Sequence, residues 1–470
     1  MQSDKKYWFL ILVLITVGAF LRLYHLDFNS FWLDEAATVI FTQQSILNYW
    51  QLLNNLGEVH PPLFYIVEKL ILPFGNSEFL YRLLPALLGI ATIPLFYLIG
   101  KKMFCCEIGL IMAALLTFSP FHVFFSQDAR MYTLLLFLMS VALLFFLKAL
   151  ETNDMRDWVI FGFFSALSLW THFFAFLFIA ILIIFALIQL MKLKKNLSNL
   201  LISAIIITIL CSPLLLIAKN LISSRTSGST WGLVGIDFVI RSMVLFLNTD
   251  PDGLLLLLIF FCFGSIVLFY DYRTKFYFIF TILLVPSFAG LILSYKMPMD
   301  PRYLIVLLPF VFMIIACGVL PFFKKLNKYL VMGIVVALII LTSTPQLSIY
   351  YTLPSNNDWR TASAQIEKIA VPGDFIVVLP EYNLIPFDYY YNNTSSGTLE
   401  YSASDFKDLE RINSLRGESN ASLFILFTDD LRFSDISGNL VVWINNKSSI
   451  VGDYTGVSVR EINSKFKGNF

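Results

Sequence analysis

Charged side chains are scarce in this sequence. Asp, Glu, Lys and Arg make up 14% of its 470 residues, whereas 58% of the residues are hydrophobic and 16% are aromatic. Soluble globular domains carry about 25% charged residues, so the deficit excludes an ordinary soluble protein of this length. The formal net charge is only +1, which gives no general attraction to nucleic acid. We therefore expect a protein that lies in a lipid bilayer and has no nucleic-acid partner.

Cysteines are also few, and their positions exclude two further classes of protein. All five lie in or beside hydrophobic segments, and residues 351–470 contain none. A disulfide framework therefore cannot stabilise the polar end of the chain. Cys105 and Cys106 are adjacent, a spacing that does not match zinc-binding motifs. The sequence thus indicates neither a disulfide-rich domain nor a zinc-binding module.

Long hydrophobic runs dominate the first 350 residues. A helix needs about 20 apolar residues to cross a bilayer. The run at 158–191 is too long for one such helix, and we interpret it as two helices that meet near His172. The first run follows Lys5 and Lys6 without a signal-peptide cleavage pattern, so we expect a retained span. Eleven spans are predicted, near residues 7–26, 80–100, 108–126, 131–150, 158–172, 173–191, 199–218, 253–270, 276–294, 303–320 and 329–346.

Lysine and arginine are concentrated in every second connection between these spans. The positive-inside rule therefore favours a cytoplasmic N-terminus, and an odd number of crossings then places residues 351–470 outside the cytoplasm. Arg22 and Arg82, near the ends of spans, are expected to reach the lipid headgroups. The connections predicted on the cytoplasmic side are 1–6, 101–107, 151–157, 192–196, 271–275 and 324–328.

The chain divides into two differently solvated parts. Residues 351–470 carry 15 Asp and Glu against 10 Lys and Arg, a net charge of −5 that leaves +6 for the rest. We interpret 1–350 as a transmembrane domain with a long first outer loop at 27–79, and 351–470 as a small extracytoplasmic α/β domain. In the first outer loop, the apolar spacing over 36–54 predicts a helix that lies along the membrane interface or packs over the helix bundle. The α/β domain is expected to have helices at 358–370 and 404–416 and strands at 374–379, 422–428 and 439–444.

Ionisable residues gather at the predicted outer ends of the spans. Such residues are costly at membrane depth, so their presence there indicates function or pairing. An exposed rim that binds lipid headgroups would show the same pattern, so clustering alone does not identify a site. Arg225 lies in a second long outer loop that could close over a ligand. The other residues of this group are Asp34, Glu35, Glu58, His60, Asp128, Arg130, His172, Asp300 and Arg302.

Four short motifs lie among these residues in chain order. They are Phe-Trp-Leu-Asp-Glu-Ala at 31–36, His-Pro-Pro-Leu at 60–63, Ser-Gln-Asp-Ala-Arg-Met-Tyr at 126–132 and Pro-Arg-Tyr at 301–303. Together they resemble the protein O-mannosyltransferase group, which is glycosyltransferase family 39 of the GT-C superfamily. They are also similar to the aminoarabinose transferases that modify lipid A. The Asp-Glu pair is the most specific of the four, and His-Pro-Pro-Leu is the next.

The resemblance implies an α-helical polytopic membrane glycosyltransferase of GT-C type whose site faces outward. It implies a polyprenyl-phosphate-linked sugar as donor and the acidic pair as the catalytic centre, with Asp34 as the base. Two features depart from the family. Residues 351–470 do not resemble the β-trefoil-bearing loop of eukaryotic protein mannosyltransferases, and His60 stands where aminoarabinose transferases carry a lysine before Pro-Pro. The sugar and the acceptor, which could be protein, lipid or glycan, are therefore left open.

The chemistry of such a donor suits these residue types. A phosphate leaves the sugar as a stable anion, so no acid needs to protonate it, and one carboxylate suffices. Asp34 would accept the proton of an acceptor hydroxyl that attacks the anomeric carbon with inversion, whereas a glycosidase needs two carboxyl groups. Negative charge that grows on the phosphate is best stabilised by arginine forks. The candidates for phosphate binding are Arg130 and Arg302, with support from His60, Tyr132 and Tyr303.

Each assignment has an alternative. Asp34 could cap a helix that begins at Ala36, and Glu35 could either orient Asp34 or bind the acceptor. We expect no required cofactor and assign no metal site, although Glu58 and His60 could ligate a divalent metal. Further candidates for acceptor binding or an accessory role are Glu58, Asp128, His172 and Arg225; for His172, a satisfied polar group at a helix junction is the alternative.

A flippase or transporter of lipid-linked sugars is the main alternative function. Proteins of that class are also polytopic and carry charged residues within the membrane. They usually consist of related halves with a binding site near the membrane midplane. Here the charged residues favour one face, and the two halves of the sequence do not match. The pattern therefore favours the enzyme.

Overall fold

The computed structural model describes residues 2–45, 60–215, 232–247, 249–391, 397–416, 421–435 and 438–462. The chain forms two compact units. The first, which we call the membrane unit, consists of Met1–Leu26 and Gln44–Tyr350, and the second, which we call the α/β unit, consists of Asp27–Gln43 and Tyr351–Phe470. Residues 27–43 were predicted to belong with the transmembrane domain, but they pack with the C-terminal residues instead.

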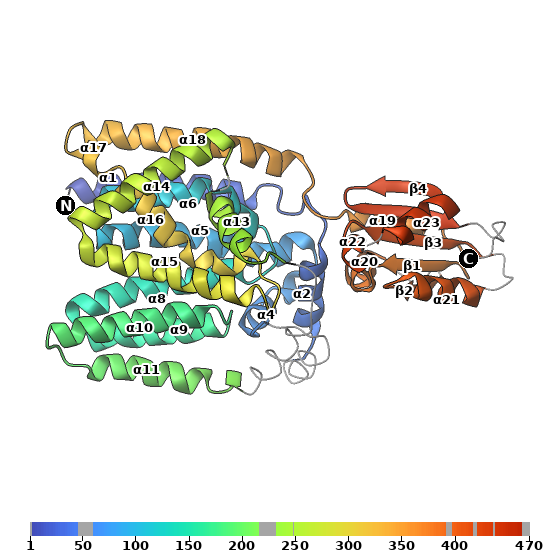
Figure 1. Ribbon diagram of the computed structural model, residues 1–470, viewed down its shortest axis with the longest axis horizontal. Helices are drawn as coiled ribbons and strands as arrows, with labels where there is room; N and C mark the ends of the chain where they lie inside the picture. Colours follow the sequence, from blue (N-terminus) through green and yellow to red (C-terminus); the bar gives the residue numbers. More distant parts are fainter. Residues whose placement is uncertain are drawn as a thin grey trace. The chain divides into compact units, whose positions relative to one another are not determined.

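The membrane unit is entirely helical within the described residues, and its long helices run side by side (Figure 1). The segment Pro301–Phe323 is the most deeply buried of the spans, with 94% of its most apolar stretch inside the protein. The elements are α1 (Gln2–Leu23), α4 (Leu63–Glu68), η1 (Leu72–Phe74), α5 (Glu78–Met103), α6 (Cys106–Phe118), α7 (Pro120–Ser126), α8 (Tyr132–Thr152), α9 (Met155–Leu169), α10 (Ala175–Lys192), α11 (Ser198–Cys211), α13 (Ile236–Leu247), α14 (Pro251–Asp271), α15 (Arg273–Leu293), η2 (Pro301–Leu307), α16 (Leu308–Cys317), α17 (Leu320–Phe323) and α18 (Lys328–Thr352).

Each predicted span coincides with a helix, but the helices differ in length. Among the described residues, eight helices are long and apolar enough to cross a membrane, or nine if α6 and α7, which meet at a bend of 61°, form one broken span. The other two predicted spans coincide with α9 and α11, which have only 15 and 14 residues. The division of 158–191 into two helices is confirmed, because α9 ends at Leu169 and α10 begins at Ala175.

The six connections predicted to be cytoplasmic meet at one end of the membrane unit. Glu107 joins 101–107 to 324–328, since its Oε1 accepts a hydrogen bond from Lys328 Nζ at 2.7 Å. The same oxygen accepts one at 2.6 Å from the hydroxyl of Tyr7, directly after 1–6. This gathering agrees with the prediction from the lysine and arginine pattern that every second connection lies at the same end of the spans. The other links are the cation–π contact of Lys6 with Tyr329, the ion pair of Lys102 with Glu151, and the hydrogen bonds of Lys195 to the Glu151 carbonyl and of Lys275 to the Met103 carbonyl.

Glycines allow α14 and α16 to approach closely. A Cβ atom on Gly264 would lie 1.8 Å from the carbonyl oxygen of Ile314, and one on Gly318 would lie 2.4 Å from that of Phe260. Small residues at such crossings let helix backbones come together, which is a common mode of helix packing in membranes. The central span is therefore held against α14 by direct backbone contact.

The α/β unit contains a five-stranded mixed sheet with strand order β2-β1-β3-β5-β4. β1 pairs in parallel with both β2 and β3, whereas β5 is antiparallel to β3 and β4. β1 and β3 are buried along their whole length, as expected for central strands covered on both faces. The strands are β1 (Phe375–Leu379), β2 (Leu399–Ser402), β3 (Leu423–Thr428), β4 (Ser449–Tyr454) and β5 (Val457–Ile462).

Helices cover both faces of this sheet. Val377 and Ile425 point to the face covered by α21 (Phe406–Arg416) and α23 (Asn439–Lys447). Their neighbours Val378 and Leu426 point to the opposite face, which α19 (Trp359–Ile369) and α20 (Leu384–Tyr390) cover. The alternation follows from the two-residue period of a strand. The short elements η3 (Glu381–Asn383) and α22 (Leu431–Ser434) complete the unit.

Beyond the first strand, one element predicted for residues 351–470 is wrong and three strands were missed. Residues 439–444 form the first part of α23, so the strand predicted there is wrong. Leu440 and Ile444 lie one helical turn apart and are both buried against the sheet, and such a short apolar run has no periodicity that separates helix from strand. The strands β2, β4 and β5 were not predicted. The hairpin between β4 and β5 turns at Gly456, whose φ of +67° favours glycine.

Candidate active site

Seven side chains of the membrane unit form a buried group, which we call the basic–aromatic cluster. Four of them are basic, and these are only 3% to 9% exposed. The four basic residues come from the segment before α4, from the turns that join α7 to α8 and α9 to α10, and from η2 at the start of the most buried span. The cluster consists of His60, Tyr65, Arg130, Tyr132, His172, Arg302 and Tyr303.

The two imidazoles lie at the centre of the cluster. The ring centroids of His60 and His172 are 5.0 Å apart, and that of Tyr303 lies 5.3 Å from His172 and 6.3 Å from His60. A backbone hydrogen bond of 3.0 Å from Leu63 N to Trp170 O joins the two segments that carry the histidines. The helix junction predicted at His172 therefore contributes its imidazole to the same place as the His-Pro-Pro-Leu motif.

Arg302 enters the cluster from the start of η2. Its guanidinium carbon lies 5.4 Å from the ring centroid of Tyr132 and 6.0 Å from that of Tyr303, distances typical of cation–π contacts. Asp300 caps η2 by accepting the backbone N–H of Arg302 at 3.0 Å, and the same oxygen lies 3.4 Å from Arg302 Nε. The cap thus fixes both the helix start and the direction of the guanidinium.

Arg130 lies in the tight turn before α8. Its Nη1 donates to the hydroxyl of Tyr65 at 3.1 Å, and its backbone N–H donates to the carbonyl of Asp128 at 2.7 Å. Asp128 is 3% exposed, so the turn is buried as a whole. Tyr65 was not among the predicted residues, and its only sequence signal is its place shortly after His-Pro-Pro-Leu.

The predicted acidic pair lies in the α/β unit. Asp34 and Glu35 are in the first turn of α2 (Leu33–Gln43), Asp34 is half-buried and Glu35 is 1% exposed. The helix begins at Leu33 and not at Ala36, because Ala36 N already donates to Trp32 O at 3.0 Å. Asp34 is therefore inside the helix and does not precede it as a cap. Carboxylates in the first turn are favoured by the helix dipole.

Part of the predicted set cannot be placed. Glu58 and Arg225 lie outside the described residues, as do residues 46–54 of the predicted interfacial helix. Of the two residues considered as metal ligands, Glu58 and His60, only His60 is therefore described. Within the described ranges, no three His, Cys, Asp or Glu side chains come together as ligands for a metal ion.

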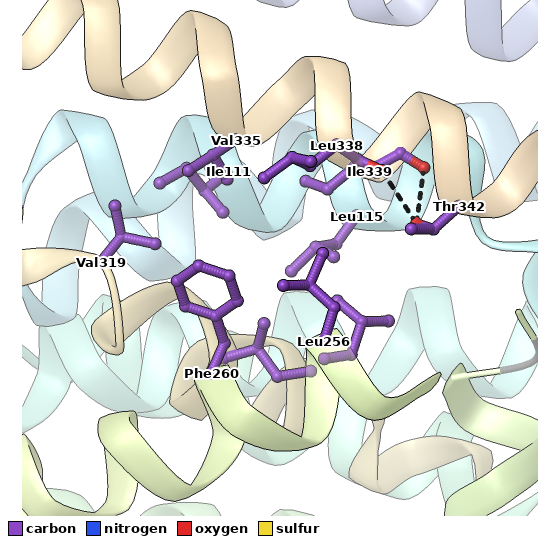
Figure 2. A pocket seen from close by; sticks show the side chains of 11 residues that line it. Ile111, Leu115, Leu256, Phe260, Val319, Val335, Leu338, Ile339 and Thr342 are labelled. Carbon is purple, nitrogen blue, oxygen red and sulfur yellow. Dashed lines mark hydrogen bonds between the residues drawn. The ribbon is translucent and has the colours of Figure 1, made fainter. Parts of the chain in front are cut away.

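An apolar groove opens in the membrane unit between α6, α14, α16 and α18 (Figure 2). Aliphatic side chains such as Leu115, Leu256 and Val335 line it together with Phe260. Thr342 is the polar side chain of its lining, and its hydroxyl donates to the carbonyls of Leu338 and Ile339. The groove can therefore hold only an apolar group.

A second void continues the groove. It shares Leu115 and Thr342 with the first and adds the hydroxyl-bearing residues Ser119, Thr249 and Ser343. Leu247 at the end of α13 also lines it, and α13 packs on η2, the element that carries Arg302. The apolar groove thus leads towards polar side chains near the element that contributes to the basic–aromatic cluster.

The comparisons with known proteins agree with this architecture. Residues 59–217 match the family described as dolichyl-phosphate-mannose-protein mannosyltransferase. The crystal structure of ArnT from Cupriavidus metallidurans bound to undecaprenyl phosphate is similar, with 11% identity and a TM-score of 0.60 over 98% of this chain and 99% of that one. The archaeal oligosaccharyltransferase AglB from Archaeoglobus fulgidus, in complex with an inhibitory peptide and a dolichol-phosphate, shows 10% identity and a TM-score of 0.56, covering 100% of this chain and 75% of that one. No curated protein sequence matches the chain.

Proposed function

We propose that this chain, which has the GT-C membrane glycosyltransferase fold and resembles family 39, transfers a sugar from a polyprenyl-phosphate donor to a hydroxyl acceptor. The observation that carries the proposal is the basic–aromatic cluster, in which Arg302, His60 and His172 surround buried tyrosines. The buried Arg130 lies two residues before Tyr132, a member of the same cluster. Both structural neighbours were solved with a lipid phosphate, undecaprenyl phosphate in ArnT and dolichol-phosphate in AglB. A buried group of cations and hydrogen-bond donors suits such an anion.

The donor phosphate binds, in this proposal, to Arg302 and Arg130. As the bond between the anomeric carbon and the phosphate oxygen breaks, the phosphate gains negative charge, which preorganised donors stabilise more strongly than they stabilise the intact donor. His60, Tyr132 and Tyr303 lie within the same cluster and complete the wall around the phosphate. Because the phosphate leaves as an anion, the cluster needs no acid.

Asp34 is the proposed general base. Its carboxylate accepts the proton of the acceptor hydroxyl while the hydroxyl oxygen forms a bond to the anomeric carbon, on the face opposite the leaving phosphate, and the configuration inverts. Glu35, which is buried beside it in the first turn of α2, orients Asp34 or contacts the acceptor. Asp128 and His172 stay candidates for accessory roles in this reaction.

The apolar groove is proposed to hold part of the prenyl chain. Its lining is aliphatic and aromatic, so a hydrocarbon would gain about 25 cal/mol for each Å² of apolar surface that it buries there. The continuation past Ser119 and Thr249 leads towards the element that carries Arg302. This arrangement suits a lipid whose chain lies among the spans and whose phosphate lies at their ends.

The orientation in the membrane is also a proposal. The basic connections meet at one end of the membrane unit, and the positive-inside rule assigns such an end to the cytoplasm. On that basis, the basic–aromatic cluster faces the opposite side. An odd number of crossings assigns residues 351–470 to the extracytoplasmic side as well. Sugar transfer would then take place on the extracytoplasmic surface of the cell membrane.

The proposed function is tested by incubating the purified protein with a panel of labelled polyprenyl-phosphate sugars and membrane extract. The expected result is transfer of one label to a protein, lipid or glycan by the wild-type chain and loss of transfer by Asp34→Asn, with donor binding retained. Asp252→Asn, at an exposed position in the first turn of α14, is the matched control and should transfer normally. Normal turnover by Asp34→Asn would remove the base assignment, and movement of an intact lipid across vesicles without bond cleavage would favour a flippase.

A further inference from the structure

Segment 27–43, which carries the acidic pair, is fixed to the C-terminal part of the α/β unit by a series of hydrogen bonds. The N–H of Phe31 donates to the hydroxyl of Tyr390 at 2.7 Å, three residues before Asp34. Ser30 Oγ donates to Asn357 O at 2.7 Å, and Asn356 Nδ2 donates to Ser30 O at 3.2 Å. The three bonds hold two consecutive residues, Ser30 through its backbone and side chain and Phe31 through its backbone.

Three further hydrogen bonds extend this attachment to earlier residues of the segment. Arg360 Nη2 donates to the carbonyls of Asp27 at 3.0 Å and Asn29 at 3.4 Å, and the side chain of Asn29 accepts the N–H of Ser355 at 2.9 Å. Hydrogen bonds from a charged donor are stronger than those between neutral groups. Four of the five residues 27–31 therefore make a hydrogen bond to the C-terminal part of the unit.

Aromatic packing supports the same attachment. Phe31 is fully buried, and its ring centroid lies 5.0 Å from that of Tyr389, the neighbour of Tyr390 on α20. α2 itself packs on α20. The helix that begins two residues after Phe31 therefore starts from a fixed position.

The groups that hold the segment belong to the rigid part of the unit. Asp358 caps α19 by accepting Thr361 N at 3.1 Å, and its own N–H donates to Thr455 O at 2.8 Å in the turn between β4 and β5. α20 packs on the sheet through the fully buried Phe387. The positions of Asn357 and Tyr390 are thus set by the sheet and by the helices that cover it.

From these contacts we infer that the α/β unit holds the catalytic segment in place, and that Tyr390 is a positioning residue for Asp34 and Glu35. The inference rests on the proposed function for the role of Asp34 and adds a role for residues 351–470 that motif resemblance does not supply. Transfer requires the carboxylate to meet the acceptor hydroxyl within hydrogen-bond reach, and small displacements of a base lower the rate steeply. Loss of the hydroxyl of Tyr390 frees the backbone at Phe31 and therefore disturbs the start of α2.

The test uses Tyr390→Phe in the full chain, which removes only the hydroxyl. The expected result is faster amide hydrogen exchange in residues 30–36 with unchanged exchange in β1 and β3. With the labelled polyprenyl-phosphate sugar that the panel identifies, kcat should fall about tenfold, as expected for the loss of one buried hydrogen bond, while the donor KM stays the same. A merely destabilised protein would instead exchange faster throughout the sheet.

Two further variants support the reading of that result. Arg360→Gln, which removes the donors to Asp27 and Asn29, should give the same split between kcat and KM. Tyr382→Phe, at an exposed tyrosine of the same unit, is the matched control and should change neither exchange nor kcat. Unchanged kcat in Tyr390→Phe and Arg360→Gln, with or without faster exchange, would overturn the inference. The proposed function fails separately, through full activity of Asp34→Asn.

Discussion

Arg22 and His122 form a buried hydrogen bond, with Arg22 Nη2 2.7 Å from His122 Nδ1. A guanidinium can only donate, so Nδ1 is the acceptor and the imidazole carries its hydrogen on Nε2. Arg22 also donates to the carbonyls of Leu116 at 2.9 Å and Thr117 at 3.3 Å. Pro120 has no N–H to offer Leu116 four residues earlier, so the arginine supplies the donor that the break between α6 and α7 removes.

Replacing Arg22 should therefore destabilise the fold. Arg22→Met leaves buried carbonyls without donors, and we expect a loss of about 2–4 kcal/mol in the free energy of unfolding. The measurement is thermal unfolding in detergent. Arg156→Met, at an exposed arginine in the first turn of α9, is the control and should change the melting temperature little. Equal melting of the two variants would show that the buried guanidinium is not structural.

Gly264 offers a test of the close approach between α14 and α16. Gly264→Ala places a methyl group against the Ile314 carbonyl, and overpacking of this kind costs about 1–3 kcal/mol. A Cβ atom on Gly333 in α18 would meet nothing within 4 Å, so Gly333→Ala should leave stability unchanged or raise it, since alanine favours a helix. Opposite shifts in melting temperature are expected, and shifts of the same sign would argue against backbone contact at this crossing.

Glu68 gives a prediction for the pH dependence of stability. It lies at the end of α4, outside the spans, is fully buried, and its burial raises the pKa of the carboxyl to about 9. The folded chain therefore keeps the proton between about pH 4.5 and 9 while the unfolded chain releases it, so this group makes stability fall as pH rises through that window.

Glu68→Gln removes the titratable carboxyl and should reduce the fall of stability with rising pH. We expect the free energy of unfolding of the variant, relative to the wild type, to increase between pH 5 and pH 8 by on the order of a few kcal/mol. The measurement is the difference between the two melting temperatures at each pH. Glu410→Gln, at an exposed carboxyl of α21, should show the same difference from wild type at both pH values. A constant difference for Glu68→Gln as well would mean that the carboxyl is not protonated in the folded chain.

Replacing Arg302 is expected to affect use of the donor but not the folding of the α/β unit. Arg302→Ala removes the guanidinium over Tyr132 and is expected to lower kcat/KM for the polyprenyl-phosphate sugar by about 100-fold, as for the loss of one charged group at a transition-state phosphate. Arg302→Lys should recover only part of the rate because an ammonium cannot form the planar fork. Unchanged kinetics in Arg302→Ala would remove the residue from the site.

Most of the membrane unit could be predicted from the sequence, because apolar length and the lysine and arginine pattern are local signals. The gathering of His60, His172, Arg302 and Tyr303 followed from the same topology. Tyr65 and the burial of Arg22 could not be predicted, since both depend on which helices become neighbours. Arg22 and Arg82 were expected at the lipid headgroups, but both are buried, and Arg82 donates to the Leu26 carbonyl at 3.1 Å.

The attachment of residues 27–43 was also beyond the sequence. Loop length and motif content place this segment beside the first span, and nothing in Phe31 or Ser30 indicates the hydroxyl of Tyr390 or the carbonyl of Asn357 as a partner. Residues 439–444 show the opposite limit, because an apolar run of six residues suits a helix or a strand until the sheet that receives it is known.

The α/β unit joins chain segments that are separated by more than 300 residues. During synthesis from the N-terminus, the segment with Asp34 and Glu35 is made long before Asn357 and Tyr390 exist, and native contacts of such high sequence separation form late. The acidic pair of an unfinished chain therefore lacks the residues that fix its segment in the folded α/β unit. The order of synthesis therefore delays the proposed chemistry until the α/β unit has folded.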